Sequence, residues 1–205
     1  MEEARGDWWR LIAEADASSS AAIELSALSW VELPDLVSFC SALPRLPFDY
    51  ISVHAPTKDI VGSDHDLAEL LAELPEWVDA IVLHPDVLTH APAFRELRDR
   101  ILLENMDGRK TIGTTATDLA AYFALLPDAG FCFDVAHAAS IDPTMTRAAE
   151  LLDAFGDRLR EVHISSLSEL GKHVPLTKTD FERFSPVLRR CRRVPWIFEA
   201  PFVPW

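Results

Sequence analysis

The stretch Ile101-Leu102-Leu103-Glu104 decides the fold, because it joins a short apolar run directly to a carboxylate. The same event recurs along the chain, where other mostly apolar runs end in a histidine, aspartate or glutamate. These runs are Ile51-Ser52-Val53-His54, Ile81-Val82-Leu83-His84, Phe131-Cys132-Phe133-Asp134, Glu161-Val162-His163 and Trp196-Ile197-Phe198-Glu199. Continuous apolar runs of this length are typical of parallel strands that are covered on both faces. If the strands close into a ring, their terminal side chains meet at one mouth.

Helical patterns separate these runs. The expected strands are residues 21–26, 50–54, 80–84, 100–104, 130–134, 160–164 and 195–199. Capping residues mark the expected helix starts, namely Asp7, Ser63 with Asp66, Thr115 with Asp118, and Thr179. A further helix is expected to start near Pro143 and end around Phe155-Gly156. Strict alternation of strands and helices predicts an α/β fold built on a parallel sheet.

The order of elements predicts an incomplete TIM-type (β/α) barrel. A helix comes first, about seven strands follow, and no helix follows the last strand, so the first strand and last helix of a complete barrel are missing. No linker or low-complexity segment interrupts residues 1–205, which we interpret as a single domain. The gap would lie between strands 21–26 and 195–199, where Trp8, Trp9 and Trp205 are expected to cover it. Because few soluble proteins leave strand edges open, a homodimer would also protect this gap.

Composition narrows the function classes. Nineteen basic and 33 acidic residues give a net charge of −14, which makes nucleic acid an unlikely partner. Three cysteines without paired spacing indicate a reducing compartment. The acidic start, Met1-Glu2-Glu3-Ala4-Arg5, does not resemble a signal peptide, and no run is long enough to span a membrane. We therefore expect a cytoplasmic protein.

The residues that end the strands are of metal-ligand type. Five of the seven histidines lie at or just after predicted strand ends, namely His54, His84, His137, His163 and His173. Any one of them alone would more often be an ordinary core or loop residue. Imidazoles gathered with Glu104, Asp134 and Glu199 are suited to one to three divalent ions, of which Zn, Mn and Fe are the candidates.

The sequence resembles the xylose isomerase-like TIM-barrel superfamily, which includes endonuclease IV and the sugar isomerases and epimerases. The matching segments are Ser52-Val53-His54-Ala55-Pro56, Val82-Leu83-His84-Pro85, Leu103-Glu104-Asn105-Met106, Phe133-Asp134-Val135-Ala136-His137-Ala138, Val162-His163-Ile164-Ser165 and Phe198-Glu199-Ala200-Pro201. They span roughly residues 20 to 201. The resemblance implies a metal-dependent site at the mouth of the barrel.

The resemblance also implies roles for individual residues. The ligands of a central metal would be Glu104, Asp134, His163 and Glu199. The ligands of a second metal, bridged by Glu104 in the endonuclease branch, would be His54 and His84. His137 and His173 would bind a third metal there, or contact substrate in the epimerase branch. One position departs from the pattern, because Gly171 stands where the endonuclease branch has an aspartate.

Four functions fit this pattern. The first is a divalent-metal-dependent isomerase or epimerase that acts on a small sugar or sugar phosphate through an enediolate. Its catalytic residues would be Glu104 and Glu199 as base and acid, with His137 orienting a hydroxyl. The alternatives are an endonuclease IV-like multi-metal phosphoester hydrolase, an iron-dependent oxidase and a non-catalytic metal-binding barrel.

Basic residues near the mouth are candidates for substrate binding. Arg109, Lys110 and Lys172 lie in loops after predicted strands, where they could hold a phosphate or carboxylate. A second basic cluster, residues 189–193, precedes the last strand. It is therefore expected at the opposite face of the barrel, away from the substrate.

Overall fold

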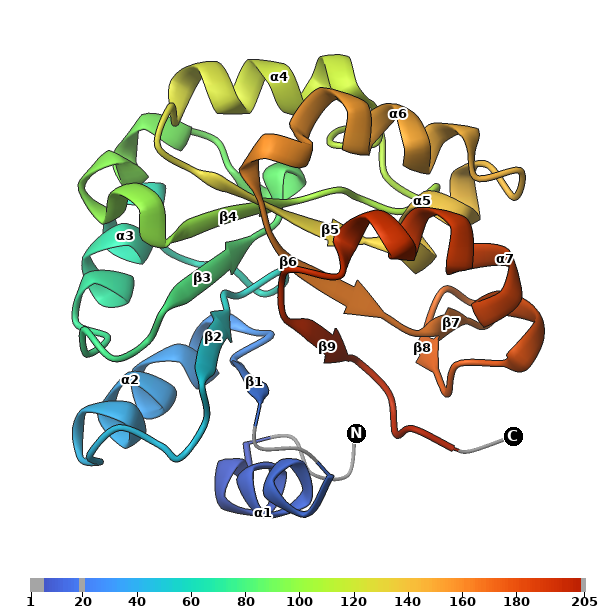
Figure 1. The fold of residues 1–205 in the computed structure, drawn as a ribbon. Helices are drawn as coiled ribbons and strands as arrows, with labels where there is room; N and C mark the ends of the chain where they lie inside the picture. Colours follow the sequence, from blue (N-terminus) through green and yellow to red (C-terminus); the bar gives the residue numbers. More distant parts are fainter. Residues whose placement is uncertain (1–5, 19–20, 204–205) are drawn as a thin grey trace.

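A parallel sheet of seven strands forms the centre of the molecule (Figure 1). The computed structural model describes residues 6–18 and 21–203. In sheet order the strands are β1 (Ala22–Ser26), β2 (Tyr50–His54), β3 (Ala80–Leu83), β4 (Ile101–Glu104), β5 (Gly130–Asp134), β6 (Leu159–Ile164) and β9 (Trp196–Phe198). All adjacent pairs are parallel. The seven predicted strands are confirmed, with ends that agree within one residue.

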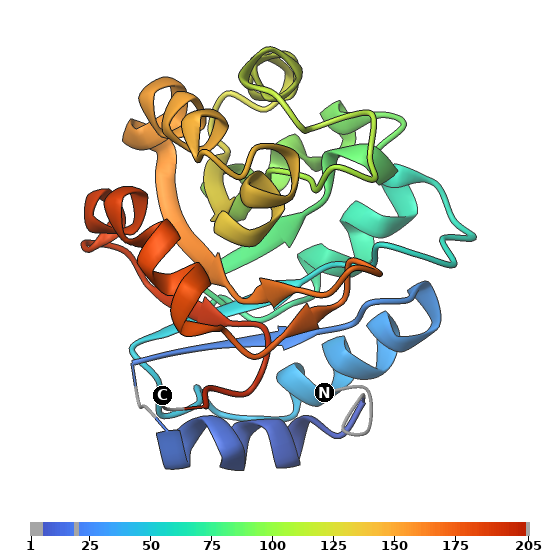
Figure 2. The same ribbon diagram turned by 90° about the vertical axis from the view of Figure 1, so that its right-hand side faces the viewer.

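The sheet curls into a nearly closed barrel, and the helices lie on its outside (Figures 1 and 2). They are α1 (Trp8–Ser18), α2 (Leu33–Ser41), α3 (Asp64–Ala72), α4 (Ala116–Leu125), α5 (Val135–Ile141), α6 (Thr146–Phe155) and α7 (Lys178–Leu188). Short 3₁₀ segments are η2 (Trp30–Glu32), η3 (Pro85–Val87), η4 (Ala91–Arg100), η5 (Gly156–Arg158) and η6 (Arg189–Cys191). A small hairpin, β7 (Ser166–Leu167) with β8 (His173–Val174), follows β6 and therefore lies at the mouth.

Most predicted helix caps are present. Ser63 and Thr115 each accept a hydrogen bond from the third helical residue and form capping boxes. The prediction for α7 was wrong by two residues, because Thr177 accepts from the amide of Asp180 and Thr179 lies inside the first turn. The helix expected near Pro143 begins only at Thr146. Before it the chain forms α5, a short helix that the sequence analysis missed because it follows β5 without a loop.

The two faces of the sheet bury different side chains. Strand residues that point outward, such as Leu25, Ile51 and Phe131, join the large apolar core beneath the helices. The inward face holds a much smaller apolar cluster of Ala80, Val82, Leu102 and Cys132, with Tyr50 packed against it. Because side chains alternate along each strand, the same inward face also carries polar residues toward the mouth.

The barrel has the expected gap. Strands β1 and β9 are the two edges of the sheet, so the first strand and last helix of a complete barrel have no counterpart in the described residues. The α1 helix packs near this edge, where Trp8 donates a hydrogen bond to the carbonyl of Ser26. Both Trp8 and Trp9 contact Phe39 of α2, although Trp9 remains 59% exposed. Trp205, the third expected cover, lies outside the described residues.

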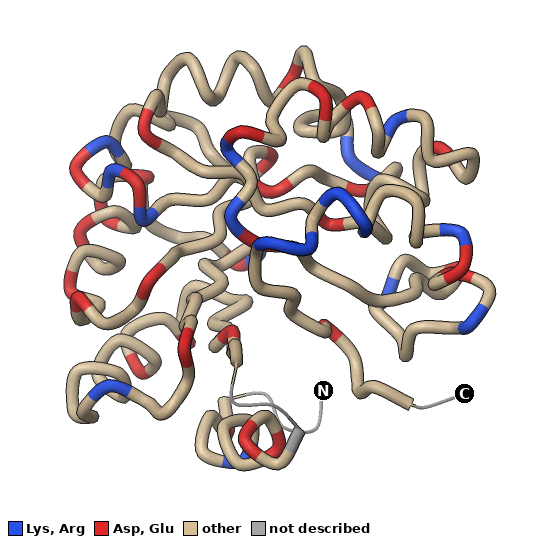
Figure 3. The backbone as a smooth tube through the Cα atoms, viewed as in Figure 1, with Lys and Arg blue, Asp and Glu red and all other residues tan. Residues whose placement is uncertain are grey.

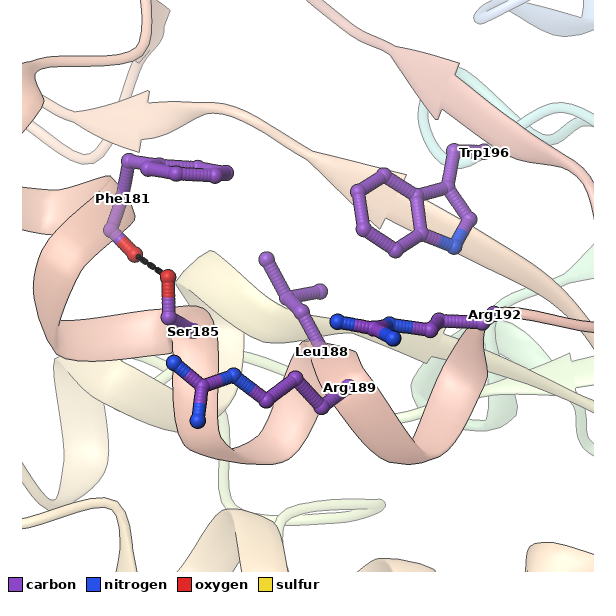
Figure 4. A pocket seen from close by; sticks show the side chains of 6 residues that line it. All are labelled: Phe181, Ser185, Leu188, Arg189, Arg192 and Trp196. Carbon is purple, nitrogen blue, oxygen red and sulfur yellow. Dashed lines mark hydrogen bonds between the residues drawn. The ribbon is translucent and has the colours of Figure 1, made fainter.

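The outer surface beside β9 is hollowed. A pocket of about 240 Å³ lies between α7 and β9 and is lined by Phe181, Ser185, Leu188, Arg189, Arg192 and Trp196 (Figure 4). Acidic residues are spread over most elements, whereas a basic run leads from the end of α7 toward β9 (Figure 3). This run precedes β9, so it lies at the end of the barrel opposite the mouth, as expected. Among the described residues, every helix is too short or too polar to cross a membrane.

Candidate metal centre

The strands deliver the predicted ligands to one place. His54, Glu104 and Asp134 are the last residues of β2, β4 and β5, and all three are buried. The other five predicted ligands lie in or next to adjoining elements, namely His84 after β3, His137 in α5, His163 in β6, His173 in β8 and Glu199 after β9. Close contacts between these side chains join all eight into one cluster at the mouth.

Glu104 is the centre of this cluster. Its Oε2 atom lies 3.3 Å from Nε2 of His54 and 2.9 Å from Nε2 of His84. Its Oε1 atom lies 3.1 Å from Nδ1 of His137 and 3.7 Å from Nδ1 of His163. One fully buried carboxylate is therefore surrounded by four imidazoles, with two on each oxygen. This arrangement suits a carboxylate that bridges two cations.

Backbone carbonyls set the tautomers of two rings. Nδ1 of His54 lies 2.9 Å from the carbonyl of Ala55, so this nitrogen donates to the backbone, and Nε2 is the nitrogen that a cation could bind after it loses its proton. Nδ1 of His137 likewise lies 2.9 Å from the carbonyl of Asn105, which leaves its Nε2 free to bind. In His54 the nitrogen held by the backbone is not the one that faces Glu104, whereas in His137 the same Nδ1 atom also lies 3.1 Å from Oε1 of Glu104.

The loop after β4 is tied to β5. The Asn105 side chain donates to the carbonyl of Asp134 and accepts from its amide, at 2.8 and 2.9 Å. Oδ1 of Asp134 accepts from the amide of His137 at 2.7 Å and so caps α5. The cap leaves Oδ2 of Asp134 facing the cluster, 3.4 Å from Nδ1 of His137.

A buried polar network supports His163 from inside the barrel. Its Nε2 atom lies 2.9 Å from Glu161 and 3.2 Å from Glu24. Glu161 also accepts hydrogen bonds from Tyr50 at 2.7 Å and from Ser52 at 3.1 Å. With Nε2 held by carboxylates, Nδ1 is the nitrogen that faces Glu104.

Two members of this network, Glu24 and Glu161, were not predicted from the sequence. Glu161 was treated only as part of a strand, and Glu24 was given no role. The available signal was a glutamate inside each of two expected strands, where a charged residue is rare unless its charge is paired.

The β7–β8 hairpin supplies His173, which lies against Glu199 after β9. Nδ1 of His173 lies 3.0 Å from Oε2 of Glu199 and 2.8 Å from the hydroxyl of Ser165. Oε1 of Glu199 lies 3.5 Å from Nδ1 of His163. The Glu199 side chain is 14% exposed, compared with 1% for Glu104. It is therefore the carboxylate of this set that reaches solvent at the mouth.

The carboxylates raise the pKa of most imidazoles of the cluster, whereas burial lowers the pKa of His84. Burial lowers the pKa of His54, but its hydrogen bond to Glu104 and the charges of Glu24 and Glu104 outweigh burial and raise it to about 9. Burial also lowers the pKa of His137, and the charges of Asp134 and Glu104 raise it to about 10. A cation that binds these rings would have to displace their protons.

The pKa values of two buried carboxylates of the cluster shift in opposite directions. Burial raises the pKa of Glu104, but the charges of His84 and His163 hold it well below its usual range. Burial raises the pKa of Asp134 to about 7, with the charges of Glu199 and Glu104 adding to the effect. Asp134 thus lies in an anionic neighbourhood that lacks enough positive charge to keep every carboxylate ionised.

The donor set fits a divalent metal. Among the buried side-chain atoms of the described residues that make no hydrogen bond, four belong to the predicted ligands of the central metal, one atom to each residue. These atoms are Oε1 of Glu104, Oδ2 of Asp134, Nδ1 of His163 and Oε2 of Glu199. Buried oxygen and nitrogen atoms without hydrogen bonds are costly unless a ligand satisfies them.

Ligand atoms also gather within 4.8 Å of one another in separate groups of three. The groups around the mouth are His54 with His84 and Glu104, Glu104 with Asp134 and His163, and Asp134 with His137 and His173. Because Glu104 and Asp134 each belong to two groups, the three groups form one continuous cluster of imidazole and carboxylate donors, as zinc, manganese and iron sites require.

The three predicted substrate-binding residues lie around this cluster. Arg109 pairs with Asp107, and Lys110 donates to Asp86 at 2.6 Å. Lys172 lies in the turn of the β7–β8 hairpin, directly before His173. Asp107, which the sequence analysis did not single out, is buried and lies 4.0 Å from Nε2 of His137.

Solved structures share this architecture. Endonuclease IV from Thermus thermophilus aligns with a TM-score of 0.54 and 19% identity, over 91% of this chain and 94% of that chain. The chain has the fold of endonuclease IV. The crystal structure of AsfvAP:AG aligns with a TM-score of 0.50 and 13% identity, over 85% of this chain and 72% of that chain. No family model and no curated protein matches the sequence. The expected xylose isomerase-like barrel is thereby confirmed as a fold.

Proposed function

We propose that this endonuclease IV-like barrel is a divalent-metal-dependent phosphoester hydrolase. The observation that carries the proposal is Glu104, whose two oxygens are each approached by two imidazoles. Such a carboxylate could be shared by the two metal ions that would stabilise the attacking and leaving oxygens in phosphoester hydrolysis. Zinc is the metal that suits this mixture of imidazole and carboxylate best.

The proposed ligands divide into two sets that share Glu104. One set is His54, His84 and Glu104, and the other is Glu104, Asp134, His163 and Glu199. Bound divalent ions would lower the pKa of a water molecule and stabilise negative charge on a phosphoryl group. The chain itself orients these ligands through the Ala55 carbonyl and the carboxylate of Glu161.

Glu199 is the residue that we propose as proton acceptor. Its carboxylate is 14% exposed, and two nearby imidazoles stabilise its charge. Burial raises the pKa of Glu199, but the nearby charges of His163 and His173 hold it well below its usual range. An ionised carboxylate next to solvent can take a proton from an attacking water.

A sugar isomerase or epimerase is the second candidate. Its support is that Glu104, Asp134, His163 and Glu199 would hold a central metal without help from the other histidines. Glu104 and Glu199 would then act as base and acid on either side of the substrate, with His137 orienting a hydroxyl. This function leaves the close approach of His54 and His84 to Glu104 unexplained, so we rank it second.

A small phosphoester is the proposed substrate. The structural neighbour is named as an endonuclease, but this chain has a net charge of −14. Its densest basic run, before β9, lies at the far end of the barrel from the mouth. Extended contact with a nucleic-acid backbone requires basic residues around the site.

We predict that His54→Ala and His84→Ala each abolish most hydrolysis of a bis-nitrophenyl phosphodiester. The rate should fall by at least about 100-fold, because a transition-state charge loses one of its two cations. His65→Ala, at an exposed histidine of α3, is the matched control and should retain full activity. Isomerisation of aldose or ketose sugars that survives both mutations would instead support the second candidate. Cleavage of abasic-site DNA that needs both histidines would extend the substrate range to nucleic acid.

We also propose that a second copy of the chain covers the open side of the barrel. Trp9 and Phe198 are 59% and 42% exposed there, and the pocket between α7 and β9 lies beside the same edge strand. Sedimentation is expected to show a dimer, and Phe198→Asp should shift it to monomer, because a buried unpaired charge opposes association. A wild-type protein that sediments as a monomer at every concentration would contradict this proposal.

A further inference from the structure

The third group of candidate ligands, Asp134 with His137 and His173, lies beside a side-chain ion pair. Like the first group, it contains one carboxylate, which it shares with the central group. A further carboxylate, Asp107, lies 4.0 Å from Nε2 of His137, but it is already paired with Arg109. A cation in this third position would therefore lie near a guanidinium.

Arg109 occupies the space next to this third group. Gly171, in the turn between β7 and β8, has a φ of +68°, and a Cβ atom at this position would collide with the guanidinium of Arg109. The turn is therefore open to Arg109 only because residue 171 has no side chain. His173 lies two residues further along the same hairpin.

Asp107 holds the guanidinium in a fixed orientation. Nε of Arg109 donates to Oδ1 of Asp107 at 2.9 Å, and Nη2 donates to Oδ2 at 2.8 Å. Nη1 donates to the carbonyl of Leu170 at 3.1 Å. Oδ2 of Asp107 in turn lies 4.0 Å from Nε2 of His137. The carboxylate of Asp107 thus lies between the Arg109 guanidinium and the ligand cluster.

The same guanidinium can still bind a ligand. A guanidinium has five N–H groups, and three of those of Arg109 are used by Asp107 and Leu170. The Arg109 side chain is 56% exposed, while Asp107 is buried. Fixed guanidinium groups of this kind bind phosphoryl oxygens with a geometry that lysine cannot provide.

We propose that Arg109 takes the place of a third metal ion in this mouth. Two divalent ions occupy the groups that share Glu104, and the Arg109 guanidinium binds a non-bridging oxygen of the substrate's phosphoryl group. The inference rests on the proposed two-metal hydrolase and adds the residue that recognises the anion. Like charges repel, so the guanidinium also disfavours a cation at His137 and His173.

Inorganic phosphate is the probe for the anion site. Titration calorimetry of the metal-loaded protein should show that Arg109→Gln weakens phosphate binding by about 10-fold or more, since a charged hydrogen-bond donor is lost. Arg95→Gln is the matched control, because Arg95 is an exposed arginine of η4 that donates to the Leu125 carbonyl, away from the mouth. Equal phosphate affinity in Arg109→Gln and wild type would overturn the proposal.

The number of bound metal ions tests the second part of the proposal, that Arg109 disfavours a third cation. Elemental analysis should find two ions per wild-type chain and three per chain in the double variant Arg109→Ala/Gly171→Asp, which exchanges the guanidinium for a carboxylate. Aspartate tolerates a positive φ better than most residues, and circular dichroism checks that the variant folds. Three ions in the wild-type protein, or two in the folded double variant, would count against the proposal. Failure of the hydrolase function itself would show differently, as a wild-type chain that binds metal and phosphate but cleaves no phosphoester.

Discussion

Glu104→Ala is expected to remove both proposed metal ions at once. Glu104 is the residue that the two proposed ligand sets share, and its two oxygens face four imidazoles. The loss should exceed that in Glu199→Ala, which touches one set only. Without metal, the variant should also unfold more easily by about 3–5 kcal/mol, since the buried imidazoles lose the anion that pairs with them.

Elemental analysis and thermal unfolding, each with and without a chelator, measure these effects. Glu104→Gln preserves the size of the side chain. It should therefore lose metal as Glu104→Ala does, but without leaving a cavity. Glu96→Ala, an exposed glutamate of η4, is the matched control and should bind as much metal as the wild-type protein. Full metal content in Glu104→Ala would refute the shared-carboxylate arrangement, whatever its stability.

Glu161→Leu is expected to weaken metal binding although Glu161 is not a proposed ligand. Glu161 accepts hydrogen bonds from Tyr50 and Ser52 and holds Nε2 of His163. Loss of the group that orients a metal-binding histidine typically costs about 10- to 100-fold in metal affinity. The leucine also leaves buried polar groups without a hydrogen-bond partner, and each such group lowers the stability of the fold by about 1–3 kcal/mol.

Two further variants separate positioning from plain stability. Tyr50→Phe removes one hydrogen bond to Glu161 and leaves the contact with His163, so it should lower stability but not metal affinity. Glu161→Gln keeps an oxygen that can face His163 and should recover part of the affinity. Chelator competition measures metal affinity, and thermal unfolding of the metal-free protein measures stability. An unchanged metal affinity in a folded Glu161→Leu protein would show that Glu161 only supports the core.

The sequence by itself determined the strands and the side chains at their ends. A strand buried on both faces is mostly apolar. Its length therefore appears in the sequence as a run of apolar residues, and its end as the first charged residue, as in Ile101-Leu102-Leu103-Glu104. Parallel strands then bring their C-terminal residues to one edge. His54, Glu104 and Asp134 could therefore be grouped from the sequence alone. Helix starts were harder to place, because Thr177 and Thr179 both suit a cap and only packing selects one.

Only the tertiary structure decided which partners each of these side chains has. Glu24 and Glu161 lie on the two strands β1 and β6, far apart in the sequence, and meet at Nε2 of His163 only because the sheet curls nearly into a ring. The pairing of Arg109 with Asp107 beside Gly171 likewise depends on where the hairpin folds over the mouth. Local periodicity records which face of a strand is buried. It carries no information on distances between segments that chain entropy keeps apart until the barrel forms.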